Sequence, residues 1–330
     1  KNSEIITPAL NFGTAVASIV KNNYKPVFVD VKKNTFCVDE TKIEKLINKR
    51  TKALLIPNLL GNLPNWPELN KIAKKYKVLL IEDSADTLGA TFNKKSSGFY
   101  SDYSITSFYG SHVINGAGNG GMLCLDKKNE YLKILTLRSW GRSSSIFKDS
   151  ENINKRLEKK ISNIQYDAKF IFSEMGYNLE PSEISAAFAL EQLKKIKYFE
   201  NQRNINFRKL FNFFSKYNDF FLLPHQDKKV TTSWLAFPIV IKKNKLFKRK
   251  DLQLFLEKNK IQTRVIMTGN ILRQPGFKKL ADKNKNNPNK FKNADFVMIG
   301  GMLLGCHQGI KNKEINYLIG KLELFIKKFI

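Results

Sequence analysis

The chain has 330 residues, of which 42% are apolar, and its 57 lysine and arginine residues against 29 acidic ones give a formal net charge of +28. This length allows a large buried core and predicts a two-domain globular protein. Because no run of about eighteen apolar residues occurs and the first residues lack a charged-then-apolar signal layout, we expect a cytoplasmic protein without a membrane partner.

Cysteine and histidine are sparse and scattered. The three cysteines and three histidines are Cys37, Cys124, Cys306, His112, His225 and His307. Their spacing supports neither a disulfide framework nor a zinc or iron–sulfur site, so we expect no bound metal. Lysine pairs occur along the whole length, as in Lys32-Lys33 and Lys327-Lys328. This spread favours a solvated basic surface over specific nucleic-acid binding.

Short apolar runs alternate with helical patterns through the first half, which is typical of parallel strands joined by crossover helices. The pattern predicts strands at residues 26–31, 53–57, 78–83 and 121–125. It predicts a helix at residues 66–76 with Leu69, Ile72, Ala73 and Tyr76 on its apolar face, and another at residues 181–199 opened by Pro181. We therefore expect an α/β domain with a mostly parallel sheet between helices.

From about residue 201 the pattern changes to long amphipathic helices with few strands, one of them at residues 234–241. We expect a large domain of residues 1–200 and a smaller C-terminal α/β domain of residues 201–330. The segment 282–289 is rich in lysine and asparagine, which predicts a mobile surface loop.

Two motifs carry the chemistry. Asp83 ends an apolar strand, where parallel sheets place their ligands, although a helix N-cap is an alternative role for such an aspartate. The sequences Glu82-Asp83-Ser84-Ala85-Asp86 and Thr106-Ser107-Phe108-Tyr109-Gly110-Ser111-His112 together resemble the cofactor site of the DegT/DnrJ/EryC1/StrS sugar-nucleotide aminotransferases. The resemblance implies the large domain of fold type I (aspartate aminotransferase-like) pyridoxal phosphate enzymes.

One position departs from the ordinary members of that family: His112 occupies the place of the lysine that binds the cofactor covalently. Where this chain has Asp86, ordinary members carry Gln or His. Where it has Tyr109 they carry His, and where it has His112 they carry Lys. The His-containing branch of CDP-4-keto-6-deoxyglucose and GDP-4-keto-6-deoxymannose 3-dehydrases resembles this chain at all three. The resemblance therefore implies a lyase that uses pyridoxamine phosphate to remove the C3 hydroxyl of a nucleotide-linked 4-keto-6-deoxyhexose, in deoxysugar or lipopolysaccharide O-antigen biosynthesis.

Histidine suits this chemistry because its unperturbed pKa near 6.5 leaves the imidazole available as a base at neutral pH, whereas lysine near 10.4 is mostly protonated. A lone histidine is more often a core or surface group, so the assignment of His112 as the catalytic base depends on the motif around it. The resemblance further implies that Asp83 is the catalytic partner of the cofactor's pyridine nitrogen and that Asp86 and Tyr109 lie at the cofactor.

Other segments extend the resemblance. Ser107 matches a serine that binds the cofactor phosphate. Asn178, in Gly176-Tyr177-Asn178, matches an asparagine that reaches the phosphate in the neighbouring subunit, which implies a homodimer with active sites at its interface. Segments that resemble the nucleotide-sugar pocket of the 3-dehydrases contribute expected substrate ligands; arginine suits diphosphate recognition. These ligands are Arg142, Asn270, Arg273 and Gln274.

Gly116-Ala117-Gly118-Asn119-Gly120-Gly121 superficially suggests a dinucleotide-binding loop. Such a loop must follow a strand and open a helix, but these glycines lead into the predicted strand at residues 121–125, which argues against it.

The resemblance also has limits. The chain starts partway into the family's large domain, so we expect that the N-terminal part carrying the phosphate loop is missing. The cysteines that hold a [2Fe–2S] cluster in one 3-dehydrase are replaced here by Ser143-Ser144-Ser145, so we expect no cluster. Turnover would then use glutamate as amino donor or a separate reductase. An aminotransferase of the same family, and a polyanion-binding protein on a retired enzyme scaffold, are the alternatives.

Overall fold

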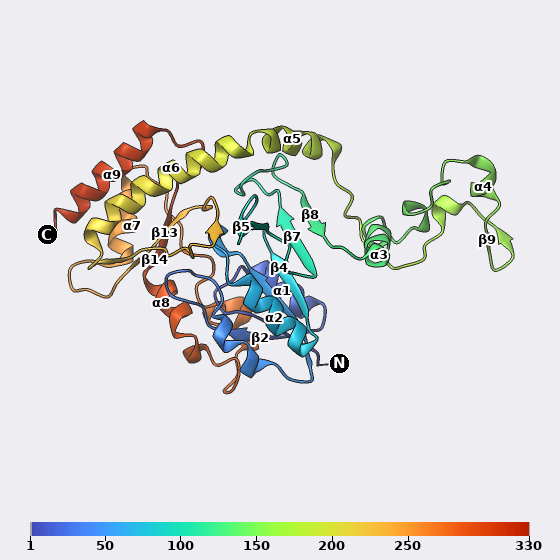
Figure 1. Cartoon of the computed structure of the whole chain (residues 1–330), viewed down its shortest axis with the longest axis horizontal. Helices are drawn as coiled ribbons and strands as arrows, with labels where there is room; N and C mark the ends of the chain where they lie inside the picture. Colours follow the sequence, from blue (N-terminus) through green and yellow to red (C-terminus); the bar gives the residue numbers. More distant parts are fainter. Residues whose placement is uncertain (1, 330) are drawn as a thin grey trace.

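The computed structural model describes residues 2–329 and contains a six-stranded sheet in the order β2-β1-β3-β4-β7-β8 (Figure 1). Strands β2, β1, β3, β4 and β7 are parallel, and β8 runs antiparallel to β7. The mostly parallel order confirms the predicted α/β architecture. The strands span Glu4–Pro8 (β1), Lys25–Val29 (β2), Thr51–Pro57 (β3), Leu79–Asp83 (β4), Tyr103–Ser107 (β7) and Gly121–Cys124 (β8).

Helices α1 (Gly13–Lys21) and α2 (Trp66–Tyr76) belong to this layered body. The bounds of α2 agree with the predicted helix at residues 66–76. Asn65 caps its first turn by accepting from the Glu68 backbone N–H at 3.3 Å, and Lys77 ends it with a left-handed φ of 53°. Leu69, Ile72 and Ala73 are buried as expected, but Tyr76 is 38% exposed, so the buried face is narrower than predicted.

The segment between β8 and α5 forms an arm that projects from the body in Figure 1. It contains α3 (Lys128–Arg138), α4 (Ile153–Leu157), β9 (Lys160–Ile161) and β10 (Ile164–Gln165). The chain returns through α5 (Glu183–Lys194) and α6 (Ile196–Phe214). The single helix predicted at residues 181–199 is therefore wrong: the backbone leaves the helical region at Lys195, with φ −96° and ψ 1°, and a second helix follows.

The C-terminal part packs helices α6, α7 (Arg249–Lys258) and α9 (Asn312–Ile326) with an antiparallel sheet around one apolar cluster. That sheet contains β11 (Phe221–Leu222), β13 (Phe237–Ile241) and β14 (Gly301–Leu304), and β13 begins three residues later than predicted. Because α6 runs through residue 200, the two predicted domains share a continuous helix. The division into residues 1–200 and 201–330 stays a prediction.

Segments of the C-terminal half also pack on the large sheet. Helix α8 (Lys292–Gly300) contributes Ala294 and Val297 to a buried cluster that includes Leu10 and Leu60, and β12 (Val230–Thr231) pairs with β5 (Thr91–Phe92), which pairs with β6 (Lys95–Ser96). Short 3-10 helices complete the chain at Glu40–Lys42, Glu44–Leu46, Leu59–Gly61, Ser143–Ser145, Ala168–Phe170, Ser215–Tyr217, Ile271–Arg273, Pro275–Leu280 and Pro288–Lys290.

The lysine-rich segment 282–289 is irregular, as predicted, but it is anchored rather than a free surface loop. Asn286 is 1% exposed, accepts from the Phe28 N–H at 3.2 Å and donates to the Pro26 carbonyl at 3.0 Å. Its buried amide thus satisfies backbone groups beside β2, an interaction that local composition could not reveal. Among residues 2–329, no helix combines the length and apolar character needed to cross a membrane.

Candidate active site

Three loops converge at the carboxyl edge of the parallel sheet, following the neighbouring strands β3, β4 and β7. The loop after β3 begins at Asn58, whose N–H donates to the Asp83 carbonyl at 2.9 Å. The loop after β4 begins at Ser84, whose N–H donates to the Ile105 carbonyl on β7 at 2.8 Å. Since the carboxyl ends of parallel strands share one edge, residues far apart in sequence meet there. This edge is the candidate active site.

Asp83 is the last residue of β4 and is partly buried. Its Oδ1 accepts from the Ala85 N–H at 3.1 Å. Burial raises the pKa of Asp83, against the Ala85 hydrogen bond and together with the charge of Glu82. The carboxyl group therefore has an increased affinity for a proton, which suits a group that shares a proton with a cationic nitrogen.

Asp86 and His112 lie next to each other although 26 positions separate them. Asp86 Oδ2 accepts from the Leu60 N–H at 2.9 Å, and its Oδ1 lies 3.7 Å from His112 Nε2. The side chains are only 13% and 17% exposed. His112 Nδ1 is buried and has no hydrogen-bond partner among residues 2–329. The structure thus brings together Asp86 and His112, two residues that the motifs place at the cofactor site.

Burial acts on both members of this pair by disfavouring their charged forms. It raises the pKa of Asp86 to about 7, against the Leu60 hydrogen bond and together with the charge of Asp83. It lowers the pKa of His112, with the Ser107 backbone acting in the opposite direction. This shift favours the uncharged imidazole, the form that can accept a proton.

The raised pKa of Asp86 predicts a stability gain from Asp86→Asn. A carboxyl group whose pKa rises from 3.8 to about 7 on folding contributes full stability below pH 4 and loses it as the pH rises towards 7. Asparagine mimics the protonated form and keeps an acceptor for Leu60. We expect Asp86→Asn to raise the free energy of unfolding by up to about 4 kcal/mol at pH 8, measured by urea denaturation.

At pH 4 the difference between the variant and the parent protein should disappear. The exposed Asp126 provides a control, because Asp126→Asn should leave the unfolding free energy unchanged at both pH values. Equal stabilities of Asp86→Asn and the parent protein at pH 8 would show that the folded protein does not penalise the Asp86 charge.

Ser107 and Tyr109 open the loop that carries His112. Ser107 Oγ accepts from the Tyr109 N–H at 3.2 Å, and the His112 N–H donates to the Tyr109 carbonyl at 3.0 Å. The Tyr109 ring is 61% exposed and stands edge-on to the His112 ring at 6.1 Å. The glycine-rich loop that follows leads into strand β8. That order confirms that it is not a dinucleotide-binding fingerprint.

Two predicted residues lie in the arm rather than at this edge. Asn178 is exposed and forms an isolated bridge with Ser139. Arg142 stacks its guanidinium on the Trp140 ring at 4.2 Å, and its Nε is buried without a hydrogen-bond partner among residues 2–329. Within one chain their contacts are to other residues of the arm, not to His112. Their roles as phosphate and substrate ligands therefore stay predictions.

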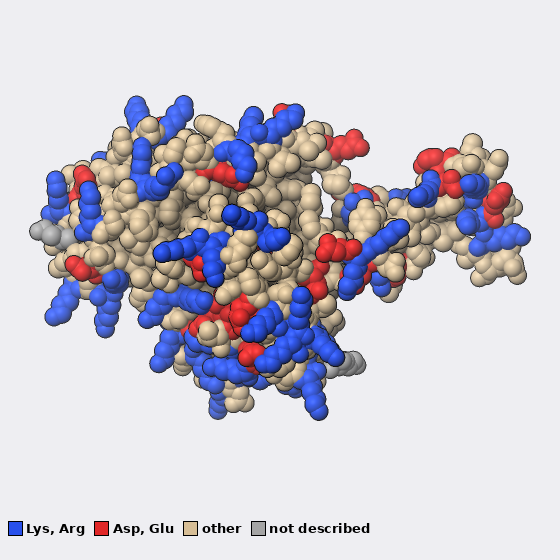
Figure 2. Space-filling model, viewed as in Figure 1, with Lys and Arg blue, Asp and Glu red and all other residues tan. Residues whose placement is uncertain are grey.

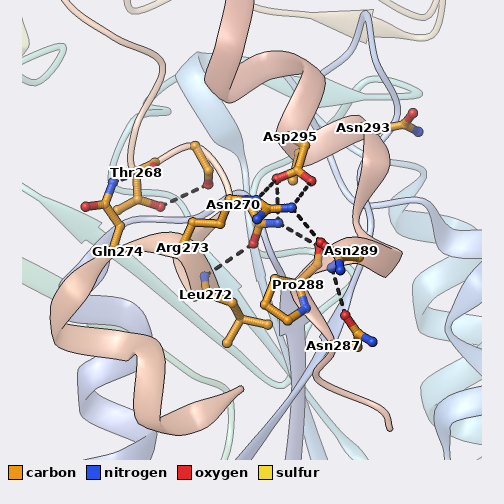
Figure 3. Close-up of polar contacts among 12 residues, drawn as sticks. Thr268, Asn270, Leu272, Arg273, Gln274, Asn287, Pro288, Asn289, Asn293 and Asp295 are labelled. Carbon is orange, nitrogen blue, oxygen red and sulfur yellow. Dashed lines mark hydrogen bonds and ion pairs between the residues drawn. The ribbon is translucent and has the colours of Figure 1, made fainter. Parts of the chain in front are cut away.

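The remaining predicted ligands form a separate polar cluster (Figure 3). Arg273 makes a bidentate ion pair with Asp295, with its Nε 2.5 Å from Oδ1 and its Nη2 2.6 Å from Oδ2. Its side chain is still 40% exposed. Gln274 donates to the Thr268 carbonyl at 2.7 Å. Arg273 and Gln274 remain proposed substrate ligands.

Asn270 in the same cluster is fully buried and uses its whole amide internally. Its Nδ2 donates to Asp295 Oδ1 at 2.8 Å and to the Pro288 carbonyl at 3.0 Å, and its Oδ1 accepts from the Leu272 N–H at 3.3 Å. We therefore assign Asn270 to holding the turn that presents Arg273, instead of the direct substrate contact expected from the sequence.

The sequence analysis did not identify Leu60, which supplies the backbone donor to Asp86. Leu60 has a left-handed φ of 59° and Gly61 follows with φ 90°, and the Leu60 carbonyl accepts from the Leu235 N–H at 2.9 Å. A Cβ on Gly61 would approach backbone atoms of Ser233 and Leu235 within 3.3 Å. Gly61, which tolerates a positive φ, is a sequence signal that favours a turn at this place.

Comparison with known proteins identifies the family. The profile of the DegT/DnrJ/EryC1/StrS aminotransferase family matches residues 1–323. The chain belongs to this family, as predicted.

Relatives and solved structures cover nearly the whole chain. The lipopolysaccharide biosynthesis protein RfbH of Salmonella typhimurium is 34% identical over 98% of this chain and 74% of its own length. The GDP-4-keto-6-deoxy-D-mannose 3-dehydratase of Escherichia coli O55:H7 is 32% identical over 96% of this chain and 79% of its length. A structure of the E. coli GDP-4-keto-6-deoxy-D-mannose-3-dehydratase with bound hydrated PLP superimposes with a TM-score of 0.83 at 31% identity, over 98% and 80% of the two chains. The predicted aminotransferase-like fold is confirmed.

The residues at the sheet edge fit a pyridoxal or pyridoxamine phosphate cofactor. Asp83 has a raised pKa and a single backbone donor, which suits a partner for a protonated ring nitrogen. His112 has a buried, unpartnered ring nitrogen within the described residues, and it cannot form the covalent link that a lysine makes. The donor set therefore favours a cofactor held by polar contacts alone.

Proposed function

We propose that this chain is a pyridoxamine-phosphate-dependent dehydratase that removes the C3 hydroxyl of a nucleotide-linked 4-keto-6-deoxyhexose in deoxysugar or lipopolysaccharide biosynthesis. The observation that carries the proposal is the position of the partly buried His112, whose Nε2 lies 3.7 Å from Asp86 Oδ1 at the carboxyl edge of the sheet. The names of the similar dehydratases confirm this class of enzyme and cofactor.

The mechanism assigns a proton task to each residue. When bound, pyridoxamine phosphate supplies an amine that condenses with the sugar ketone and a ring that accepts electrons. Asp83 holds the proton on the ring nitrogen. The His112 imidazole accepts the proton that must be removed before the C3 hydroxyl departs, and it can return a proton to that hydroxyl. Asp86 Oδ1, 3.7 Å from Nε2, stabilises the imidazolium formed in between.

We further propose that Ser107 and Asn178 bind the cofactor phosphate and that Arg142, Arg273 and Gln274 bind the nucleotide sugar. The planar guanidinium group of arginine can donate two parallel hydrogen bonds to the oxygens of a diphosphate. Among residues 2–329 no group of three or more metal-binding side chains occurs. For regeneration of the cofactor, we propose glutamate as amino donor or a separate reductase. A cytoplasmic location stays a prediction.

A homodimer would complete the site. Among residues 2–329, thirty-three large hydrophobic residues are exposed in the single chain, and twenty of them lie between Met122 and Tyr198, in β8, the arm and the helices that follow. All four residues of β8 are exposed, which is unusual for a strand of a layered α/β sheet. We propose that a second copy covers this region and that its Asn178 reaches the cofactor phosphate, as the family resemblance implies.

Ile184 on α5 offers a test of the dimer. It is 80% exposed in the single chain, and a charge there would be buried unpaired in each half of a symmetric interface. We expect Ile184→Glu to raise the dimer dissociation constant at least about 100-fold, measured by sedimentation velocity. Leu254→Glu on α7, where Leu254 is 48% exposed, should leave it unchanged. An Ile184→Glu protein that sediments as the parent dimer would exclude α5 from the interface.

Product analysis with CDP- and GDP-4-keto-6-deoxyhexoses, pyridoxamine phosphate and glutamate tests the function. A 3-deoxy-4-keto product supports the proposal, whereas a 4-amino sugar would identify an aminotransferase. Borohydride treatment with pyridoxal phosphate should leave no lysine adduct. The polyanion-binding alternative predicts salt-sensitive binding to random-sequence DNA. On the face shown in Figure 2, lysine and arginine side chains spread over both the body and the arm.

A further inference from the structure

Glu82 is the most heavily hydrogen-bonded carboxylate in the described chain outside the chemistry assigned above. It precedes Asp83 on β4 and is 1% exposed. Its Oε1 accepts from Asn58 Nδ2 at 2.6 Å, from Ser84 Oγ at 2.6 Å and from Ser97 Oγ at 2.5 Å. Its Oε2 accepts from the Gly98 N–H at 2.8 Å and from Ser101 Oγ at 3.4 Å.

These donors come from three separate segments that meet at the sheet edge. Asn58 follows β3, Ser84 follows β4, and the group from Ser97 to Ser101 precedes β7. Asn58 is itself fixed, because its Oδ1 accepts from the buried Trp66 Nε1 at 2.8 Å. A buried carboxylate with this many donors carries its charge without a cation, since hydrogen bonds replace the lost hydration.

Glu82 and Asp83 point to opposite faces of the sheet, because side chains alternate along a strand. Among residues 2–329 the neighbouring acids differ sharply in their donors: Glu82 has five, whereas Asp83 has only the Ala85 N–H and Asp86 only the Leu60 N–H. The hydrogen bonds thus stabilise a negative charge on Glu82 far more than on Asp83.

We propose that Glu82 is a positioning residue for Asp83: its carboxylate ties the loops after β3 and β4 to the segment before β7 and places a negative charge next to Asp83 on the same strand. The inference rests on the proposed function, in which Asp83 holds the proton of the cofactor ring. In support, the Glu82 charge contributes to the raised pKa of Asp83. Removing that charge should make Asp83 a weaker proton partner.

The test compares Glu82→Gln with Glu4→Gln. Glu4 is also 1% exposed and hydrogen-bonded, but it lies at the start of β1, at the opposite edge of the same sheet. We expect both variants to lose stability in urea denaturation. Only Glu82→Gln should bind pyridoxamine 5′-phosphate about tenfold more weakly and shift the pH midpoint of the bound ligand's absorbance to lower pH.

Glu82→Asp, which keeps the charge, should restore the midpoint although the shorter side chain reaches fewer donors. If Glu82→Gln fails to fold, Ser97→Ala removes one donor but keeps the charge, and it should weaken pyridoxamine 5′-phosphate binding by a smaller factor with the midpoint unchanged. A midpoint and affinity in Glu82→Gln equal to those of Glu4→Gln, or an unchanged affinity in Ser97→Ala, would overturn the inference alone. A parent protein that binds no pyridoxamine 5′-phosphate would overturn both the inference and the proposed function.

Discussion

His112→Asn should lower kcat for C3 dehydration by about 10²- to 10⁴-fold, the usual contribution of a positioned general base. Asparagine is polar and fits the space of the imidazole, but it accepts no proton at neutral pH. The His112 side chain is 17% exposed beside Asp86, and burial lowers the pKa of its imidazole, which favours the uncharged form that can accept a proton. The rate of 3-deoxy product formation measures the effect.

The loss should fall on kcat with KM unchanged, because the proton transfer occurs only on the way to the transition state. Binding of pyridoxamine 5′-phosphate should persist, since His112 is not proposed to hold the cofactor. His225→Asn serves as control, because His225 is exposed and lies outside the three loops of the site. A His112→Asn enzyme with kcat within tenfold of the parent would remove His112 from the reaction.

Asp83→Asn should lower kcat by about 10²- to 10³-fold, the scale of losing one preorganised electrostatic contact to a developing charge. Asparagine keeps the shape of the aspartate and can still accept from the Ala85 N–H. It cannot carry the charge that holds a proton on the ring nitrogen, so the ring becomes a poorer acceptor of electrons. Single-turnover kinetics with pyridoxamine 5′-phosphate bound at saturation measure the loss.

Asp102→Asn provides the matched control for Asp83→Asn. Asp102 accepts from the Leu80 N–H at 2.8 Å, near the opposite end of β4, so its replacement disturbs the same strand without touching the site. We expect Asp102→Asn to retain the parent rate. Equal rates for Asp83→Asn and Asp102→Asn would contradict the assignment of Asp83 as the ring-nitrogen partner.

The sequence alone located the catalytic edge. Asp83 ends an apolar strand, and parallel strands bring their carboxyl ends together whatever the rest of the fold does. The motif around His112 then supplied the family and the cofactor, which the comparisons confirm, and His112 as the proposed base. Helix α2 was predicted to the residue because its cap, its proline and its apolar face are all local features.

Tertiary structure alone decided which partners these residues meet. The Leu60 N–H on Asp86, the Asp295 carboxylate on Arg273 and four of the five donors on Glu82 come from segments distant along the chain. Asn286 anchors a stretch that its composition predicts to be free, and Asn270 is turned inward. Local patterns encode burial and backbone preference, but they do not encode which donor a buried polar atom finds after the chain has folded.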